Sequence, residues 1–362
     1  MSPHSDSGPA HGHGPAHGHG PAHGHGPAHG HGPAHGHGPA HGHGPAHGHG
    51  PAHGRAHADT TGHGHGHHST DVDWDVMATQ LESGAELQLP GLRRAAAHLG
   101  GLLGPRAEVG RVLDIGSGPG VMTCVLAEAF AGAETVAVDA TPGLLDRVRA
   151  RAGKLGLGDR VAVRHAELPE GLHSGDGPGG DGLGTADLIW SSKLVHHLGD
   201  QQGALDALAR VLRPGGVLAV AEGGLPMRFL PRDIGIGRPG LQARLDALHE
   251  HWFAIMRAEL PGSTPVVEDW PAMLGRAGLS RVGSFTYLLD LPAPLGGAAR
   301  AFLHTQLNRL RESAGDMLDA DDLDTLDVLL DPGARHGILH RTDAFLLSAT
   351  TVFTGVREAS GD

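Results

Sequence analysis

Apolar and polar positions divide the chain into two parts with different patterns. In residues 1–70 large apolar side chains are almost absent, because the hexapeptide GPAHGH repeats from Gly8 to about His53 and a His/Gly-rich stretch follows to His68. Proline removes a backbone donor and glycine favours no single conformation, so neither helix nor strand can propagate here. Since few apolar side chains offset the entropy cost of ordering, we predict that residues 1–70 form a disordered His/Gly/Pro/Ala-rich tail.

From residue 71 onward, apolar residues recur with the spacings of helices and strands. Segment 71–104 has the pattern of two short helices with a break near Pro90. Apolar runs typical of strands then alternate with amphipathic segments typical of helices. The expected strands are 112–115, 135–140, 160–166, 187–192 and 217–222, and the expected helices are 121–130, 142–156 and 201–212. Such alternation predicts a parallel sheet with helices on both faces.

Beyond residue 222 the alternation loosens. Helical patterns cover 239–260 and 270–277, a strand pattern covers 281–289, an acidic helical stretch covers 297–330, and a last strand covers 344–356. We therefore expect an α/β domain at 71–362, with a Rossmann-like, doubly wound, seven-stranded and mostly parallel sheet. N-terminal helices precede this sheet, and a helical insertion lies between its last two strands near the C-terminus.

The strongest local motif is VLDIGSGPG, residues 112–120, in which a strand leads into a glycine-rich turn and a helix follows directly. Gly116, Gly118 and Gly120 allow a sharp bend and a close approach of the backbone to a ligand. The helix N-terminus presents amide groups toward the same place. The spacing is G-x-G-x-G, and Val121 stands where the dinucleotide-binding fingerprint has its third glycine.

Further polar groups follow the next expected strands, at the sheet edge where ligands of such folds bind. Asp139 ends TVAVD, and the sequence Ala166-Glu167-Leu168 follows the third strand. DLIWSSKLVHHL (187–198) contains the fourth strand, and LRPGGVLAVAE (212–222) contains a Pro-Gly-Gly turn before the fifth.

These five segments, in this order, resemble the class I S-adenosylmethionine (SAM)-dependent methyltransferases. The resemblance extends from about residue 71 to residue 357 and divides the domain into N-terminal helices (71–104), a SAM-binding core (105–222) and a substrate-side part (223–362). It implies that Asp114 helps to hold the SAM amino group and that the glycine loop passes under the methionine part. Asp139 would bind the ribose, and Glu167, where Asp is commoner, would lie near adenine. The implied SAM-binding residues are Asp114, Gly116, Ser117, Gly118, Gly120, Asp139, Ala140, Glu167, Leu168 and Ser191.

Three side chains near the expected methyl-transfer position are candidate catalytic groups. His196 and His197 follow the fourth strand, and Glu222 ends the fifth. A general base adds about 10²–10⁴-fold in rate when the acceptor is a hydroxyl or an ammonium. One of the histidines can equally be packed or bonded to the backbone, and Glu222 can orient a polar substrate instead. No acidic cluster accompanies the fourth strand, so we expect no metal in the active site.

Charge and composition narrow the class of partner. The net charge is −13, and the acids lie almost wholly outside the tail. A fold this acidic repels nucleic-acid phosphates, so we expect a small-molecule acceptor and no nucleic acid. No run of eighteen apolar residues and no secretory leader occur, so we expect no membrane span and a cytoplasmic location. The sequence does not indicate the oligomeric state.

Two other functions stay open at this point. An NAD-dependent oxidoreductase would use a similar strand–loop–helix, although the missing third glycine and the Arg-Pro-Gly-Gly turn count against it. A metal-binding protein would use the tail, where His-x-His pairs recur every six residues. Imidazoles such as those of His63, His65, His67 and His68 suit nickel or zinc. The alternative is a repeat expansion without function.

Overall fold

The structure is a computed structural model that describes residues 74–104, 108–168, 171, 182–314 and 317–358. The chain divides into two units, 1–66 and 67–362, and every described residue belongs to the second. The predicted disorder of the tail and its candidate metal ligands therefore lie outside the described residues.

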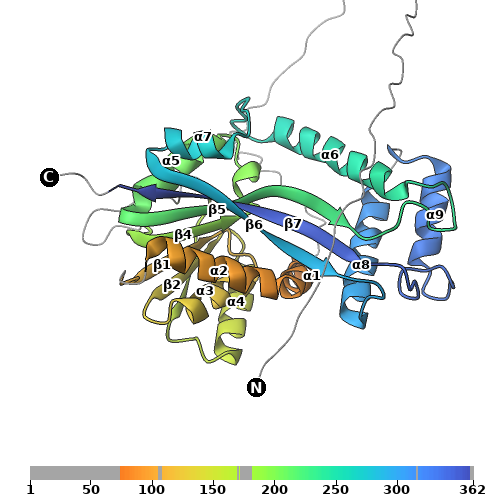
Figure 1. Ribbon diagram of the computed structural model, residues 1–362, viewed down its shortest axis with the longest axis horizontal. Helices are drawn as coiled ribbons and strands as arrows, with labels where there is room; N and C mark the ends of the chain where they lie inside the picture. Colours follow the sequence, from red (N-terminus) through yellow and green to blue (C-terminus); the bar gives the residue numbers. More distant parts are fainter. Residues whose placement is uncertain (1–73, 105–107, 169–170, 172–181, 315–316, 359–362) are drawn as a thin grey trace, which may run out of the picture. The chain divides into compact units, whose positions relative to one another are not determined.

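A seven-stranded sheet forms the centre of the second unit, in the order β3-β2-β1-β4-β5-β7-β6 (Figure 1). Strands β1 to β5 pair in parallel, whereas β7 lies antiparallel between β5 and β6. This arrangement confirms the expected mostly parallel, doubly wound sheet. The strands are β1 (Arg111–Ile115), β2 (Glu134–Asp139), β3 (Val161–His165), β4 (Ala186–Ser192), β5 (Leu212–Arg228), β6 (Leu279–Leu291) and β7 (Leu346–Arg357).

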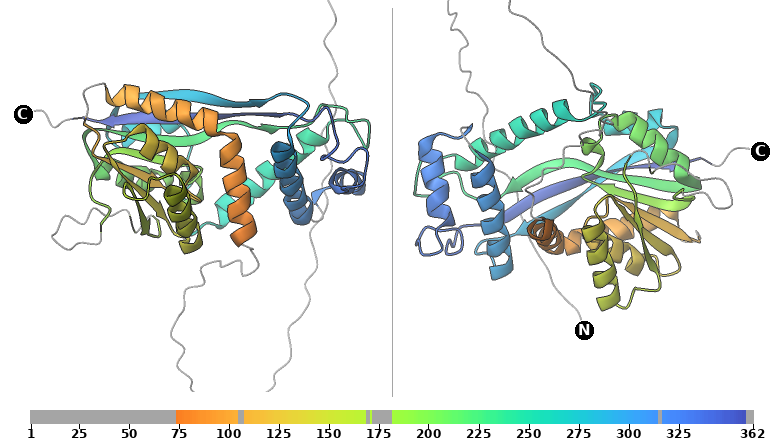
Figure 2. Two further views of the ribbon diagram at one scale, coloured as in Figure 1. Left: turned by 90° about the horizontal axis from the view of Figure 1, so that it is seen from below. Right: turned by 180° about the vertical axis from the view of Figure 1, so that it is seen from behind.

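Helices cover both faces of the sheet, as the alternation of the sequence predicts (Figures 1 and 2). One face packs against α2 (Leu89–Leu103), α3 (Val121–Ala129) and α4 (Pro142–Lys154), and the other against α5 (Gln201–Val211) and α7 (Trp270–Arg276). Trp190, on β4, is 1% exposed and packs in the core with α2 and α3. The sheet is thus packed between two apolar layers. The carboxyl ends of β1, β2 and β4 lie at its edge, where a ligand can bind.

The N-terminal segment forms two helices, α1 (Trp74–Leu87) and α2, with the break at Gln88. Pro90 stands in the first turn of α2, where its missing N–H leaves no hydrogen bond unmade. The predicted break near Pro90 is thus confirmed. Helix α1 then packs against α8 (Gly297–Ala314), from the far end of the chain.

Strands β5 and β6 are longer than the pattern predicts, and together with β7 they extend to a second apolar core. This core joins them to α6 (Leu241–Glu259), α8 and α9 (Ala320–Leu330), and α8 and α9 lie beyond one end of the sheet in Figure 2. The expected helical stretch 297–330 is two helices, because the Asp319 side chain caps a new helix by accepting from the Asp322 amide at 3.1 Å.

The Pro-Gly-Gly segment before the fifth strand is a bulge within β5 instead of a separate turn. Leu212 pairs with Ala186 and Val217 with Leu188, so the four residues 213–216 of β5 stand opposite the single residue Asp187 of β4. Gly215 has a φ of 83° there, a conformation that glycine adopts without strain.

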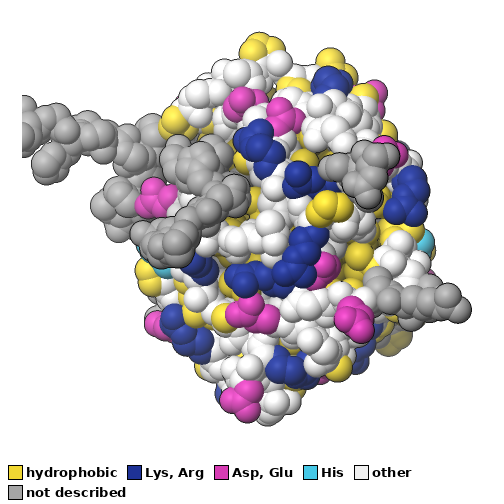
Figure 3. Space-filling view, turned by 90° about the vertical axis from the view of Figure 1, so that its left-hand side faces the viewer, with side chains coloured by type: hydrophobic (Ala, Val, Ile, Leu, Met, Phe, Trp, Pro, Cys, Tyr) yellow, Lys and Arg dark blue, Asp and Glu magenta, His cyan; other side chains and the backbone are white. Residues whose placement is uncertain are grey.

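The surface at the amino ends of the strands carries charges of both signs. Arg111 pairs with Glu134 at 2.9 Å, and Arg213 pairs with Asp187 at 3.0 Å. Figure 3 shows Lys and Arg side chains interspersed with Asp and Glu on the face where β7 ends. Among the described residues, no helix combines the length and apolar character that crossing a bilayer requires.

Candidate functional site

The glycine loop between β1 and α3 has three glycines with left-handed backbone, at φ values of 72°, 54° and 80° for Gly116, Gly118 and Gly120. A Cβ at Gly116 would lie 2.9 Å from the Leu194 side chain, and one at Gly120 would lie 2.7 Å from Val148. A Cβ at Gly118 would meet nothing within 4 Å. Gly116 and Gly120 are therefore required by protein packing, whereas Gly118 faces open space.

Asp139, at the end of β2, holds this loop by its carboxylate. Its Oδ2 accepts from the Gly118 amide at 2.9 Å, and its Oδ1 accepts from the Thr141 amide at 2.9 Å. Each oxygen keeps a second lone pair. The carboxylate is partly exposed, so both oxygens can still accept from two hydroxyl groups of a ligand.

Asp114, on β1, is 2% exposed, and its Oδ2 accepts from the Thr123 hydroxyl at 2.6 Å. Burial raises the pKa of this carboxyl to about 7, the Thr123 hydrogen bond opposes the rise, and the charge of Asp139 adds to it. A nearby cation would favour the ionised form and lower this pKa. The hydroxyl of Ser117, in the same loop, is buried without a hydrogen-bond partner.

The residues expected near adenine lie at the carboxyl end of β3. The Ala140 carbonyl lies 2.9 Å from Nε2 of His165. Glu167 is exposed, while Leu168 packs against the core of the sheet. Ser191 is fully buried on β4, and its hydroxyl has no partner.

The three candidate catalytic groups form one hydrogen-bonded chain. Glu222 is 3% exposed; its Oε2 lies 2.7 Å from Nδ1 of His196, and Nε2 of His196 lies 3.0 Å from Nε2 of His197. The Oε1 of Glu222 accepts from the amides of Leu194 and Val195, each at 3.0 Å. Glu222 thus fixes the turn after β4, which contains the short 3₁₀ helix η2 (Val195–His197).

His197 is a weak base in this setting. Burial lowers its pKa to about 4, the neighbouring His196 lowers it further, and the Glu222 carboxylate opposes the change. A base works best when its pKa lies near the operating pH. His197 is therefore a poor candidate for a proton acceptor at neutral pH.

A cavity of about 750 Å³ opens beside the glycine loop and reaches the helices of the substrate-side part. Its lining includes Asp114 and Ser117 at the loop and Lys193 after β4. Further away it includes Gln80 from α1 and Arg309 from α8. One pocket therefore connects the predicted cofactor loop with helices that lie far away in the sequence.

The lining separates the predicted site residues into two groups. Asp114 and Ser117 line the cavity. The other predicted site residues do not: Gly116, Gly118, Gly120, Asp139, Ala140, Glu167, Leu168, Ser191, His196, His197 and Glu222. The cavity-lining residues on the helices were not predicted, because the only pattern in these segments is amphipathic periodicity. Lys193 was not predicted either, although it lies directly after the fourth strand.

A second cavity of about 740 Å³ lies between α1 and α8 and shares Gln80, Leu87 and Phe302 with the first. The Nε2 of Gln80 donates to Oε1 of Gln306 at 3.1 Å and so links the two helices.

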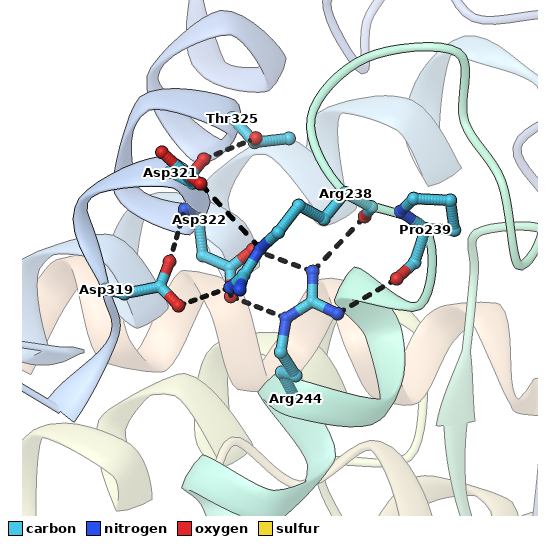
Figure 4. Close-up of polar contacts among 7 residues, drawn as sticks. All are labelled: Arg238, Pro239, Arg244, Asp319, Asp321, Asp322 and Thr325. Atoms are coloured by element: carbon cyan, nitrogen blue, oxygen red, sulfur yellow. Dashed lines mark hydrogen bonds and ion pairs between the residues drawn. The ribbon is translucent and has the colours of Figure 1, made fainter.

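Ion pairs join the start of α6 to the start of α9 (Figure 4). Arg244 donates to Oδ1 of Asp322 at 2.7 Å, Arg238 donates to Oδ2 of Asp322 at 3.0 Å, and Arg238 also pairs with Asp319. The Asp322 side chain is 1% exposed. These contacts hold α6 and α9 together in the second apolar core. Within the described ranges, no group of three or more His, Cys, Asp or Glu side chains is arranged to hold a metal ion.

Comparisons with known proteins agree with this geometry. Residues 113–218 match a family model described as a methyltransferase domain. The chain is 34% identical over 148 residues to the biotin biosynthesis bifunctional protein BioCD of Bordetella avium, covering 41% of this chain and 29% of that protein. It is 28% identical over 232 residues to the trans-aconitate 2-methyltransferase of Methylobacterium radiotolerans, covering 63% of this chain and 74% of that protein.

A solved structure is similar as well. The SAM-dependent methyltransferase of Geobacter sulfurreducens, in complex with S-adenosylhomocysteine (SAH), is 20% identical with a TM-score of 0.38, covering 71% of this chain and 89% of that one. The first curated relative is thus matched over less than a third of its length, and the second over about three quarters.

Proposed function

We propose that the chain carries a class I SAM-dependent methyltransferase domain and that it transfers the methyl group of SAM to a small-molecule acceptor in the cytoplasm. The observation that carries this proposal is the cavity that joins the glycine loop to the helices α1 and α8. Asp114 and Ser117 line its end at the loop, and side chains of α1, α6 and α8 line the other end.

The residues present fit SAM. Gly118 faces open space, the Asp139 carboxylate keeps free lone pairs, and the buried Ser117 hydroxyl lacks a partner at the loop. We assign the ribose to Asp139 and Ala140, the amino group to Asp114, and adenine to Glu167 and Leu168. The methionine part belongs to Gly116, Ser117, Gly118 and Gly120, with Ser191 behind it on β4. SAM, when bound, supplies a methyl group activated by a sulfonium.

The chain's own contribution to catalysis is positioning. Alignment of two reacting groups can lower a barrier by about 7–11 kcal/mol. We propose that Glu222 and His196 position the turn after β4, since Glu222 accepts from two amides of this turn and from His196. A role of His196 as a base stays a prediction, because His196 does not line the cavity.

The acceptor class rests on the cavity and on the relatives. A volume of about 750 Å³ suits a small organic molecule. The name of the relative from Methylobacterium radiotolerans gives trans-aconitate, a small acid, as what that enzyme methylates. We propose an acceptor of similar size for this chain.

Calorimetric titration of SAM and SAH into the wild type and into Asp139→Ala tests the function. We expect micromolar binding to the wild type and a loss of at least thirtyfold in Asp139→Ala, with the thermal unfolding midpoint recorded for both. A matched control is Asp146→Ala, an exposed carboxylate on α4. Absence of SAM and SAH binding to the folded wild type would overturn the proposal.

A further inference from the structure

Lys193 occupies an unusual backbone position directly after β4. Its φ is 51°, in the left-handed region, and among the described residues only Arg281 is another non-glycine with positive φ. Non-glycine residues in this region are strained, and such strain gathers at functional sites. The Lys193 amide donates to the Ala221 carbonyl at 3.1 Å, which ties the residue to the end of β5.

The Lys193 ammonium has no hydrogen bond or ion pair with any described residue. Glu222, the carboxylate that acts on it electrostatically, already uses Oε1 for two backbone amides and Oε2 for His196. The cavity lining contains three acids. Asp114 is engaged with Thr123 and Asp246 with Arg228 and Gln242, whereas Glu250 makes no hydrogen bond with a described residue. None of the three forms an ion pair with the Lys193 ammonium among the described residues.

The cavity that Lys193 lines is mostly apolar. Its walls include Trp190, Met227, Phe229, Leu245, Leu289 and Phe302. Desolvation by the surrounding protein lowers the pKa of Lys193, and the Glu222 charge opposes this change. The Lys193 residue is exposed in the free protein, so water can solvate its ammonium. A ligand that displaces this water has to supply a partner for the cation, and an anionic group does so.

We propose that Lys193 binds a carboxylate of the acceptor, so that the acceptor is an apolar molecule bearing at least one carboxylate group. This inference rests on the proposed function, because the cavity is the acceptor site only if the adjoining loop holds the cofactor. A monoanionic group matches the single ammonium. A phosphate is best held by an arginine cluster, whereas the described lining of the cavity contains one arginine, Arg309.

Lys193 acts as a specificity residue in this proposal. A carboxylate pairs with its ammonium, whereas the matching amide leaves the ammonium unpaired. Sites built around a polar partner reject analogues that lack it far more strongly than apolar walls reject a change of size. The apolar walls then select the shape of the rest of the molecule.

The test uses the full chain loaded with SAH and three acid–amide pairs of different shape: decanoate and decanamide, trans-cinnamate and cinnamamide, and 2-naphthoate and 2-naphthamide. Calorimetry measures each Kd in the wild type, Lys193→Met, Lys193→Arg, Arg309→Met and Lys154→Met. Lys154, the second of the two lysines of the chain, is exposed near the end of α4 and is the matched control.

We expect at least one acid to bind the wild type at least tenfold more tightly than its amide. Lys193→Met reduces this preference below threefold, Lys193→Arg restores part of it, and Lys154→Met leaves it unchanged. The preference for the acid over the amide also disappears as the pH rises through the pKa of Lys193. Because this pKa is lowered, the loss occurs at a lower pH than for an ordinary lysine.

Three results would overturn the inference: no acid preference in any pair, a preference that survives in Lys193→Met, or a preference lost only in Arg309→Met. SAH affinity is measured first in each variant. Normal SAH binding without acid preference rejects the role of Lys193 and leaves the methyltransferase proposal standing. A failure of SAH binding in the wild type rejects the proposed function itself.

Discussion

Gly118 differs from the other glycines of its loop, because only its missing side chain would point into open space. An alanine there costs about 1–2 kcal/mol of backbone strain at a φ of 54° and fills the space left for the cofactor. We expect Gly118→Ala to weaken SAH binding at least tenfold while the thermal midpoint falls by only a few degrees. Calorimetry and thermal unfolding measure the two effects.

Gly120→Ala is the matched comparison for this prediction. Its Cβ would lie 2.7 Å from Val148, so the main effect should be a larger fall of the thermal midpoint than in Gly118→Ala. Wild-type SAH affinity in Gly118→Ala would show that the cofactor does not approach the loop at this residue.

Asp114 makes cofactor binding depend on pH. With a pKa of about 7 the carboxyl is mostly protonated at pH 6, and the amino group of the cofactor would favour its ionised form. Binding should therefore release about 0.9 proton at pH 6 and almost none at pH 8.5. Calorimetry of SAH in two buffers with different ionisation enthalpies gives this number. Equal heats in both buffers at pH 6 would contradict it, and Asp114→Asn should remove the release.

The same residue affects the stability of the free protein. The pKa of Asp114 is higher in the folded protein than in the unfolded chain. At a pH between these two pKa values, the folded protein therefore binds more protons than the unfolded chain. The contribution of Asp114 to stability is therefore complete below about pH 4, and it is lost as the pH rises toward 7. A bound cofactor cation reduces this loss, which links the two effects.

At the scale of elements, the ion pairs of Asp322 link α6 and α9. Replacing Asp322 by Asn leaves Arg238 and Arg244 without their shared, buried partner. We expect the free energy of unfolding to fall by about 1–3 kcal/mol at pH 7, as measured by urea denaturation. The arginines lower the pKa of Asp322, so the contribution is present above the ordinary aspartate pKa. This contribution to stability is lost as the pH falls through the pKa of Asp322 in the folded protein. The difference in unfolding free energy between Asp322→Asn and the wild type should therefore shrink at pH 3.

The control for this prediction is Asp327→Asn, which breaks the pair with Arg311 between α8 and α9. That pair is largely exposed, with side chains 35% and 54% accessible, and exposed ion pairs contribute little to stability. An equal loss in both variants would mean that burial of Asp322 adds nothing to its contribution.

The elements show how far the sequence determines this fold. Strands 112–115 and 135–140 and the glycine loop between them were predictable, because apolar runs and glycine spacing act locally. The full length of β5 was not, since residues 223–228 are kept extended by pairing with β7, which comes more than a hundred residues later. The division of 297–330 into two helices depends on one capping aspartate, Asp319.

The acceptor end of the site was less predictable, for a reason of tertiary structure. Gln80, Lys193 and Arg309 line one cavity although they lie on α1, after β4 and on α8. No local pattern relates them, and only the packing of α1 against α8 brings them together. Glu222, His196 and His197 were each predicted as a candidate catalytic residue, but their hydrogen-bonded chain was not predicted. Its role in catalysis stays a prediction, because these residues do not line the cavity.

At the scale of the whole molecule, the repeat tail and the fold should act independently. The described site lies wholly in the unit 67–362, and every cofactor-binding residue follows residue 110. We therefore expect removal of residues 1–70 to leave the SAH Kd within twofold and the thermal midpoint within about two degrees of the full chain. Nickel or zinc uptake, measured by elemental analysis after dialysis, should fall to near zero, because the recurring His-x-His pairs leave with the tail. A SAH affinity that drops more than tenfold on truncation would mean that the tail takes part in the site, whereas unchanged metal uptake would place the metal ligands among the histidines of the fold.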